Sequence, residues 1–209
     1  MGKLLYIQAS PRGERSYSIA AAGAFVNSYK QAHPEDEVVT LNLFTKNLPP
    51  FDGLALNAKY TILHGKDHSA EEVAAWREIE DIIVEFKSAA KYVLTVPMWN
   101  FSIPYRLKHY LDILIQPTYT FSFSPKEGYT GLVTGKPIFV SFSRGGEYPP
   151  GSENEALDFQ TKYLMMILGF IGFTDIRTLM TEPTLSGPEA AQEKKEAAIA
   201  KAKEMAKSF

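Results

Sequence analysis

Short apolar runs and helical patterns alternate along this chain, and the alternation constrains the fold more than any other feature. Runs rich in β-branched and aromatic residues predict buried strands at residues 4–7, 37–43, 92–96, 137–142 and 175–180. Segments with apolar residues three and four apart predict helices at residues 16–30, 70–89, 103–115, 154–170 and 188–208. The stretch 44–69 is looser, with an extra helical region expected between the second and third strands, and the stretch 116–135 is expected to be irregular.

Alternating strands and helices fold into a parallel sheet that is covered by helices on both faces. Five strands favour the flavodoxin-like strand order 2-1-3-4-5 over the six-stranded dinucleotide-binding arrangement. The chain has 209 residues and shows no internal repeat, low-complexity tract or linker. We therefore expect a single α/β domain over residues 1–209, built on a five-stranded parallel sheet.

Composition and charge exclude several classes of function. The chain has no cysteine, which rules out disulfides, thiolate catalysis and cysteine-ligated metal sites. A net charge of −2 gives no general attraction to nucleic acid or to anionic membranes. The apolar start is too short for a signal-peptide core, and the longest near-apolar run, residues 164–173, is about half of a membrane span. We therefore expect a cytoplasmic protein with no nucleic-acid or membrane partner.

Three loops rich in ligand-binding groups follow the first, third and fourth predicted strands. They are Ser10–Ser18, Pro97–Pro104 and Ser143–Gly146. In an open parallel sheet, ligands bind beyond the carboxyl ends of the strands, near the point where the strand order reverses. We expect the three loops to meet at that edge and to form one site.

The first loop leads into a predicted helix. Backbone N–H groups at a helix N-terminus attract an anion, and Ser10, Ser16 and Ser18 add hydroxyl groups, with Arg12 or Arg15 as a source of charge. The loop therefore suits a phosphate, although it matches neither the Walker A nor the Gly-x-Gly-x-x-Gly pattern. The alternative is a solvated loop in which one serine only caps the helix.

The second loop suits a flat ring with polar edges. Met98, Trp99 and Phe101 are large and apolar, and Asn100 between them carries both a donor and an acceptor. The alternative is a hydrophobic plug over the edge of the sheet.

The third loop contains Gly145 and Gly146, which allow the backbone to approach a ligand closely. The alternative here is a simple turn with a solvated Arg144. A phosphate site, an aromatic surface and a glycine turn at one sheet edge together describe a site for flavin mononucleotide (FMN).

Longer motifs carry a resemblance to a known family. They are Pro97-Met-Trp-Asn-Phe-Ser-Ile-Pro104, Leu107-Lys-His-Tyr-Leu-Asp112, Gly131-Leu-Val-Thr-Gly-Lys136, Ser143-Arg-Gly-Gly146, and Tyr163-Leu followed by Gly169-Phe-Ile-Gly172. In these motifs, and nearly end to end, the chain resembles the FMN-dependent NADH azoreductases, which also act as quinone oxidoreductases. It departs from them at Trp99, where many members have tyrosine, and in its more charged first loop.

The resemblance implies a flavodoxin-like homodimer with two FMN sites at the dimer interface. It also implies a ping-pong cycle, in which NADH or NADPH reduces FMN and the flavin then reduces a quinone or an azo bond. FMN would be held by residues of all three loops, namely Ser10, Ser16, Tyr17, Ser18, Met98, Trp99, Asn100, Phe101, Ser143, Arg144, Gly145 and Gly146. Because the flavin carries the chemistry, we expect no catalytic side chain and no metal. Backbone N–H groups of Asn100 or Phe101 are expected to stabilise the reduced ring.

Aromatic residues are dense between residues 116 and 135. Tyr119, Phe121, Phe123 and Tyr129 are too many for a solvated loop, and exposed apolar patches of this kind mark an interface or a ligand groove. We expect Tyr119, Phe121 and Phe123 to form a substrate lid, with some of them crossing to the partner's site. The alternative is a hairpin packed on its own subunit.

Two other functions fit parts of the pattern. A flavodoxin-like carrier of electrons to a protein partner would be more acidic around its flavin and would not need an aromatic lid. A phosphate-ester hydrolase would need metal ligands or a nucleophile elbow, and Ser141 and Ser143 do not form Gly-x-Ser-x-Gly. His64 and His68 have metal-ligand spacing, but with no third ligand evident they are interpreted as solvent-exposed. The sequence names neither the physiological acceptor nor a preference for NADH or NADPH.

Overall fold

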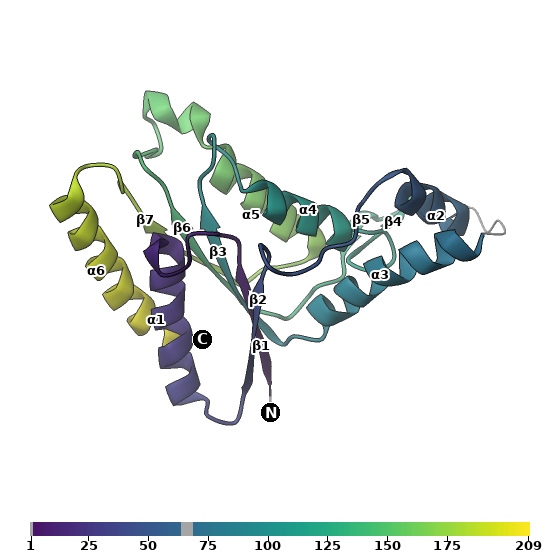
Figure 1. Ribbon diagram of the computed structural model, residues 1–209, viewed down its shortest axis with the longest axis horizontal. Helices are drawn as coiled ribbons and strands as arrows, with labels where there is room; N and C mark the ends of the chain where they lie inside the picture. The colour runs from purple at the N-terminus through teal and green to yellow at the C-terminus, as the bar shows by residue number, and fades with distance from the viewer. Residues whose placement is uncertain (1, 64–68) are drawn as a thin grey trace.

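A five-stranded sheet forms the centre of the protein, whose computed structural model describes residues 2–63 and 69–209 (Figure 1). The strand order is β2-β1-β3-β6-β7, and every neighbouring pair is parallel. The bounds are β1 (Lys3–Gln8), β2 (Glu37–Asn42), β3 (Lys91–Pro97), β6 (Ile138–Ser143) and β7 (Ile176–Thr181). Since β6 and β7 are the fourth and fifth strands of this sheet, the expected order 2-1-3-4-5 is confirmed.

The three central strands explain why the sequence shows continuous apolar runs. All six residues of β6 are buried, as are the middle residues of β1 and β3. A strand that packs against helices on both faces needs apolar side chains at successive positions rather than at alternate ones. The edge strands β2 and β7 are only partly buried, and their sequences alternate more.

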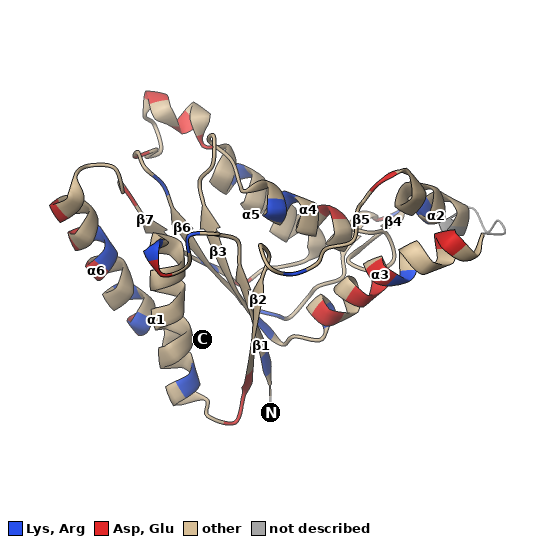
Figure 2. Cartoon of the chain, viewed as in Figure 1, with Lys and Arg blue, Asp and Glu red and all other residues tan. Residues whose placement is uncertain are grey.

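Helices cover both faces of the sheet (Figure 1). One face carries α1 (Tyr17–Ala32) and α6 (Pro188–Ala206), which share a buried cluster with Leu4, Phe25 and Phe139. The other carries α3 (Ala70–Lys87), α4 (Tyr105–Leu114) and α5 (Phe159–Ile171), whose apolar residues pack with Leu5 and Val140. Charged residues of both signs are spread over the outer helices, as Figure 2 shows. None of the described helices is long and apolar enough to span a membrane.

The extra helical region expected between the second and third strands is α2 (Gly53–Leu63), which lies in the looser stretch 44–69. Asp52 starts this helix, since its Oδ1 accepts hydrogen bonds from the N–H groups of Leu54 and Ala55. Among the side chains of this helix that the structure describes, the buried ones are Ala55 and Ala58. His64 and His68, the pair at metal-ligand spacing, lie outside the described residues.

Other boundaries also differ from the expected ones. Pro104 precedes α4 as its N-cap instead of lying in the first turn, because the helix begins at Tyr105. The predicted helix 154–170 is divided into a short 3₁₀ helix, η2 (Glu153–Leu157), and α5. Asp158 separates the two and caps α5 by accepting a hydrogen bond from the Thr161 N–H.

The aromatic stretch 116–135 is not irregular, because it contains an antiparallel hairpin of β4 (Phe121–Ser124) and β5 (Gly128–Gly131). The hairpin packs against the C-terminal end of α5. Phe121 contacts Phe170 with ring centroids 4.9 Å apart, and the Val133 N–H donates to the Ile171 carbonyl. At Gly131 the contact is so close that a Cβ atom would lie 2.3 Å from the Gly172 nitrogen.

Gly131→Ala is therefore expected to lower the free energy of unfolding by about 1–3 kcal/mol, because the added methyl group overpacks this contact. Gly169→Ala is the matched control, since a Cβ there meets nothing within 4 Å. In the helix interior it is expected to be neutral or to stabilise by up to about 1 kcal/mol. Urea unfolding followed by circular dichroism measures both changes. Equal losses in the two variants would contradict the packing of β5 on α5.

Candidate functional site

The carboxyl edge of the sheet brings the three predicted loops together at one cavity of about 180 Å³. Eight of the predicted residues line it: Ser10, Ser16, Tyr17, Met98, Trp99, Ser143, Arg144 and Gly145. Arg12, Pro97, Thr184 and Leu185 complete the lining. Ser18, Asn100, Phe101 and Gly146 do not line this cavity, although each belongs to one of the three loops. The structure therefore brings the three predicted loops together at one cavity, as expected.

The first loop prepares the start of α1 for an anion. Ser16 is the N-cap, and its hydroxyl accepts from the Ile19 N–H and lies 3.1 Å from the Ser18 hydroxyl. The first turn of α1 carries no acidic side chain, so nothing there competes with a bound anion. Arg12 is exposed on the lip of the cavity and supplies a positive charge. Ser16 thus caps the helix, as the alternative interpretation expected, and it also lines the cavity.

The second loop contains a tight two-residue turn. The Trp99 and Ser102 backbones exchange hydrogen bonds of 2.9 and 3.0 Å, and between them Asn100 and Phe101 have φ angles of 47° and 69°. Neither residue is glycine, and a non-glycine residue in this left-handed region costs about 1–3 kcal/mol. Backbone strain of this kind persists only where the surrounding structure fixes the conformation, and it clusters at active sites and ligand-binding sites. The sequence did not indicate this turn, because no glycine marks it.

The turn leaves two backbone donors available. Its hydrogen bonds use the N–H groups of Trp99 and Ser102, and the N–H groups of Asn100 and Phe101 have no partner among the described residues. The Met98 N–H donates to the Ser143 carbonyl at 2.8 Å, which ties the second loop to the third. Two unpartnered N–H groups next to a cavity suit the edge of a polar ring.

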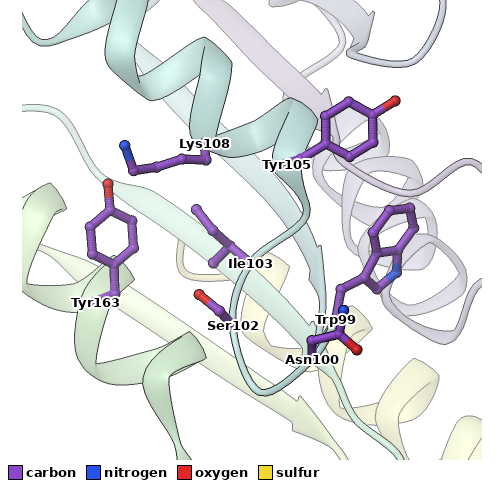
Figure 3. A pocket seen from close by; sticks show the side chains of 7 residues that line it. All are labelled: Trp99, Asn100, Ser102, Ile103, Tyr105, Lys108 and Tyr163. Atoms are coloured by element: carbon purple, nitrogen blue, oxygen red, sulfur yellow. The ribbon is translucent and has the colours of Figure 1, made fainter.

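Trp99 joins the first cavity to a second one of about 410 Å³, on the side toward α4 and α5 (Figure 3). The lining residues of this second cavity are Trp99, Asn100, Ser102, Ile103, Tyr105, Lys108 and Tyr163. In Figure 3, Lys108 and Tyr163 lie together at one end and Trp99 and Asn100 at the other. Trp99 also packs near Phe44 and Tyr105, with ring centroids 5.8 and 6.3 Å away. The second loop is therefore a partly exposed aromatic wall rather than a buried plug.

The third loop is anchored by Arg144. The alternative of a solvated arginine is wrong, because Arg144 is only 7% exposed and its guanidinium pairs with Asp158 and Glu182 at 2.7 and 2.6 Å. Burial lowers the pKa of Arg144, but the two carboxylates outweigh that effect and raise it above its ordinary value. Burial by itself raises the pKa of Asp158. The hydrogen bond from the Thr161 N–H and the charge of Arg144 outweigh that effect, so the pKa of Asp158 lies below its ordinary value.

A fourth segment lines the cavity, and sequence reasoning missed it. The Thr184 N–H donates to the Arg144 carbonyl at 3.0 Å, and the Leu185 N–H donates to the Gly145 carbonyl at 3.2 Å. This segment follows β7, so its position after a fifth parallel strand was the available signal. Leu185 is 86% exposed although it is apolar, which is unusual for a residue that lines a cavity.

The predicted lid residues line neither cavity. The Tyr119 hydroxyl donates to Glu80, and its carbonyl accepts from Lys87, so Tyr119 is tied to α3 of its own chain. Phe121 packs on Phe170, as described above. Only Phe123 and Tyr129 project, with 61% and 66% of their surface exposed. The hairpin therefore packs mainly on its own chain, and Phe123 and Tyr129 remain exposed.

The donors present fit FMN in kind. Hydroxyl and N–H groups at a helix N-terminus suit its phosphate, and the apolar Met98, Trp99 and Leu185 suit its ring. The unpartnered N–H groups of Asn100 and Phe101 suit the ring's polar edge. No group of three or more His, Asp or Glu side chains in the described part of the chain is arranged to hold a metal ion.

Comparisons with known proteins agree with the fold. The profile of a family described by its flavodoxin-like fold matches residues 2–206. An FMN-dependent NADH:quinone oxidoreductase of Nitratidesulfovibrio vulgaris (strain Hildenborough) is 51% identical over 210 residues, which cover 100% of both chains. One from Pseudomonas fluorescens is 37% identical and covers 100% of this chain and 98% of its own.

Solved structures give the same result. An azoreductase from Bacillus anthracis matches with a TM-score of 0.91 and 32% identity, covering 100% of both chains. An FMN-dependent NADH-azoreductase from the same species, in complex with FMN, matches with a TM-score of 0.85 and 28% identity over 99% of this chain and 100% of its own. The fold and the converging loops define a flavodoxin-like protein. The chain belongs to the flavodoxin-like family that contains these FMN-dependent NADH:quinone oxidoreductases.

The strained turn gives a prediction that needs no ligand. Asn100→Val is expected to lower the free energy of unfolding by about 1–3 kcal/mol relative to Asn100→Gly, since a β-branched residue is disfavoured at positive φ and glycine is not. Thermal and urea unfolding of both variants measure the difference. A valine variant as stable as the glycine variant would show that residue 100 does not hold a positive φ.

Proposed function

We propose that this chain is an FMN-dependent oxidoreductase that takes hydride from NADH or NADPH and reduces quinones and azo compounds. The observation that carries the proposal is the convergence of Ser10–Ser18, Met98–Phe101 and Ser143–Gly146 at one cavity. These loops come from strands far apart in sequence, and the parallel sheet alone brings them together. The family to which the chain belongs supports the same activity.

The first loop binds the phosphate in this proposal. Ser16, Tyr17 and Ser18 form the first positions of α1, where N–H groups and the helix dipole favour a negative charge. Ser10 is buried beside them and adds a hydroxyl group, and Arg12 adds charge at the lip. All of the predicted first-loop residues thus act on one end of the cofactor.

The second and third loops bind the ring. When bound, FMN supplies the hydride and electron-transfer chemistry. Met98 and Trp99 provide an apolar wall, and the N–H groups of Asn100 and Phe101 stabilise negative charge on the ring edge that faces them. The third loop binds the ring through its backbone in this proposal, at Ser143, Arg144, Gly145 and Gly146. No side chain is required as an acid or a base.

The second cavity takes the planar acceptor in this proposal. Trp99 and Asn100 belong both to this cavity and to the loop that binds the ring, so an acceptor here lies next to the cofactor. Its walls are largely aromatic or aliphatic, from Trp99, Ile103, Tyr105 and Tyr163, which suits quinones and azo compounds.

We further propose that the single domain works as a homodimer, with a second copy over one apolar face. On α5, Phe159, Tyr163, Met166 and Phe170 are three and four residues apart and share one side of the helix. This side connects the second cavity, through Tyr163, with the hairpin residues Phe123 and Tyr129. An apolar strip that is exposed at Phe159 and Met166 and half-buried at Tyr163 and Phe170 suits a subunit interface. We place the enzyme in the cytoplasm, where the NADH that it consumes is regenerated.

Anaerobic spectroscopy tests the activity. FMN-loaded protein is expected to lose its flavin absorbance when NADH is added and to regain it when benzoquinone follows, because hydride enters and leaves in separate half-reactions. Free FMN at the same concentration is the control. If FMN binds but NADH does not bleach it, the chain is an electron carrier that needs a reductase partner. If FMN does not bind, the proposed site is wrong.

Light scattering tests the dimer. The wild-type chain is expected to have twice its mass of 23.3 kDa in solution, and Phe123→Ser is expected to shift the equilibrium toward the monomer at micromolar concentration. Val84→Ser is the control, because Val84 on α3 is equally exposed at 62% but lies outside the strip. A wild-type chain that stays monomeric would contradict the proposal.

A further inference from the structure

Arg144 is committed to bonds within the chain. Its Nη1 donates to Asp158, and its Nε and Nη2 donate to Glu182, at 2.7, 2.6 and 3.4 Å. The flat face of the guanidinium lies 5.0 Å from the centre of the Tyr148 ring. The backbone of Arg144 is also used on both sides, because its N–H donates to the Thr181 carbonyl and its carbonyl accepts from Thr184.

These contacts join segments that are not paired with each other as strands. Asp158 is the N-cap of α5, Glu182 follows β7, and Tyr148 belongs to the loop after the two glycines. The same contacts fix two walls of the first cavity. One wall is Ser143–Gly145, and the other is Thr184–Leu185, which pairs with Arg144 and Gly145 through its backbone.

The charges around Arg144 disfavour a direct role in binding phosphate. One guanidinium faces two carboxylates, so the group as a whole carries a negative charge in a poorly hydrated place. A phosphate brought close to Asp158 and Glu182 would be repelled, and it would have to break charge-assisted hydrogen bonds to reach the arginine. The start of α1 offers it free N–H groups and no acidic side chain in the first turn.

We propose that Arg144 is a positioning residue, which uses Asp158 and Glu182 to hold the Ser143–Gly145 and Thr184–Leu185 segments against the flavin ring without contacting the phosphate. The inference rests on the proposed function and deepens it. It differs from the expectation that Arg144 itself holds FMN, because its guanidinium is bound to the two carboxylates. It also gives a role to the exposed Leu185, which a bound ring would cover.

Riboflavin, which lacks the phosphate, separates a positioning role from a direct one. Dissociation constants for FMN and riboflavin are measured by fluorescence titration of the full-length, flavin-free chain. Arg144→Met, Glu182→Gln and Asp158→Asn are each expected to weaken both ligands by the same factor, on the order of tenfold, so that the ratio of the two constants stays at the wild-type value. In an Arg144→Met background, Glu182→Gln is expected to weaken flavin binding little further, because both changes break the same network.

Two controls exclude general destabilisation. Asp175→Asn makes the same carboxylate-to-amide change at the other end of β7, where the exposed Asp175 pairs with the half-buried Arg177, and is expected to bind both flavins as the wild type does. Ala202→Gly destabilises the buried side of α6 and is also expected to keep wild-type affinity below its unfolding temperature. At saturating FMN, Glu182→Gln is expected to shift the visible flavin spectrum, and Ala202→Gly is not.

Several outcomes would overturn the inference. If the dissociation constant for riboflavin divided by that for FMN falls toward one in Arg144→Met, the guanidinium holds the phosphate. Wild-type affinity in Glu182→Gln and Asp158→Asn would mean that the network does not position the loop, and these milder variants decide the matter if Arg144→Met does not fold. A wild-type chain that binds neither flavin would overturn the proposed function and this inference with it.

Discussion

The parallel register of the three central strands is the constraint on which the site depends. Gln8 pairs with Thr95, and Pro97 pairs with Ser143, so β1, β3 and β6 end side by side. Neighbouring strands lie about 4.8 Å apart, and the loops that leave them therefore start close together whatever their sequence separation. The Met98 hydrogen bond to Ser143 continues this register one step beyond the sheet. A shift of one residue would turn every side chain of a strand to the opposite face and would displace the loop that follows it.

Beyond the strands, each loop is fixed by a different local device. The first is fixed by the N-cap of α1 at Ser16, and the second by a turn that holds Asn100 and Phe101 at positive φ. The third is fixed by the ion pairs of Arg144. The second and third devices have a cost in isolation, namely a strained backbone and a desolvated charge, and all three hold donors or walls in place before a ligand arrives. Preorganised donors stabilise developing charge without reorganisation at the moment of reaction, which is what hydride transfer to and from a bound flavin requires.

Local patterns in the sequence were sufficient for the sheet, the flanking helices and the three loops at one edge. They were not sufficient where the structure depends on distant partners. Arg144 looks solvated in sequence because its carboxylates are 14 and 38 residues away. The bounds of α2 were not predicted within the looser stretch 44–69. The hairpin was predicted only as the alternative to a substrate lid, because its strands have four residues each and give a weak pattern. Leu185 was missed because its relation to the site follows from the position of β7 at the sheet edge.

The central claim is that FMN binds at the carboxyl edge of the sheet, and backbone amide NMR spectra with and without FMN test it most directly. The account predicts that the resonances of Ser18, Asn100, Phe101 and Gly145 move on addition of FMN. Those of residues at the opposite edge, such as Glu37 and Asp175, are predicted to stay in place. If the loop resonances stay fixed and those lining the groove between α1 and α6 move instead, FMN binds elsewhere and the account is contradicted.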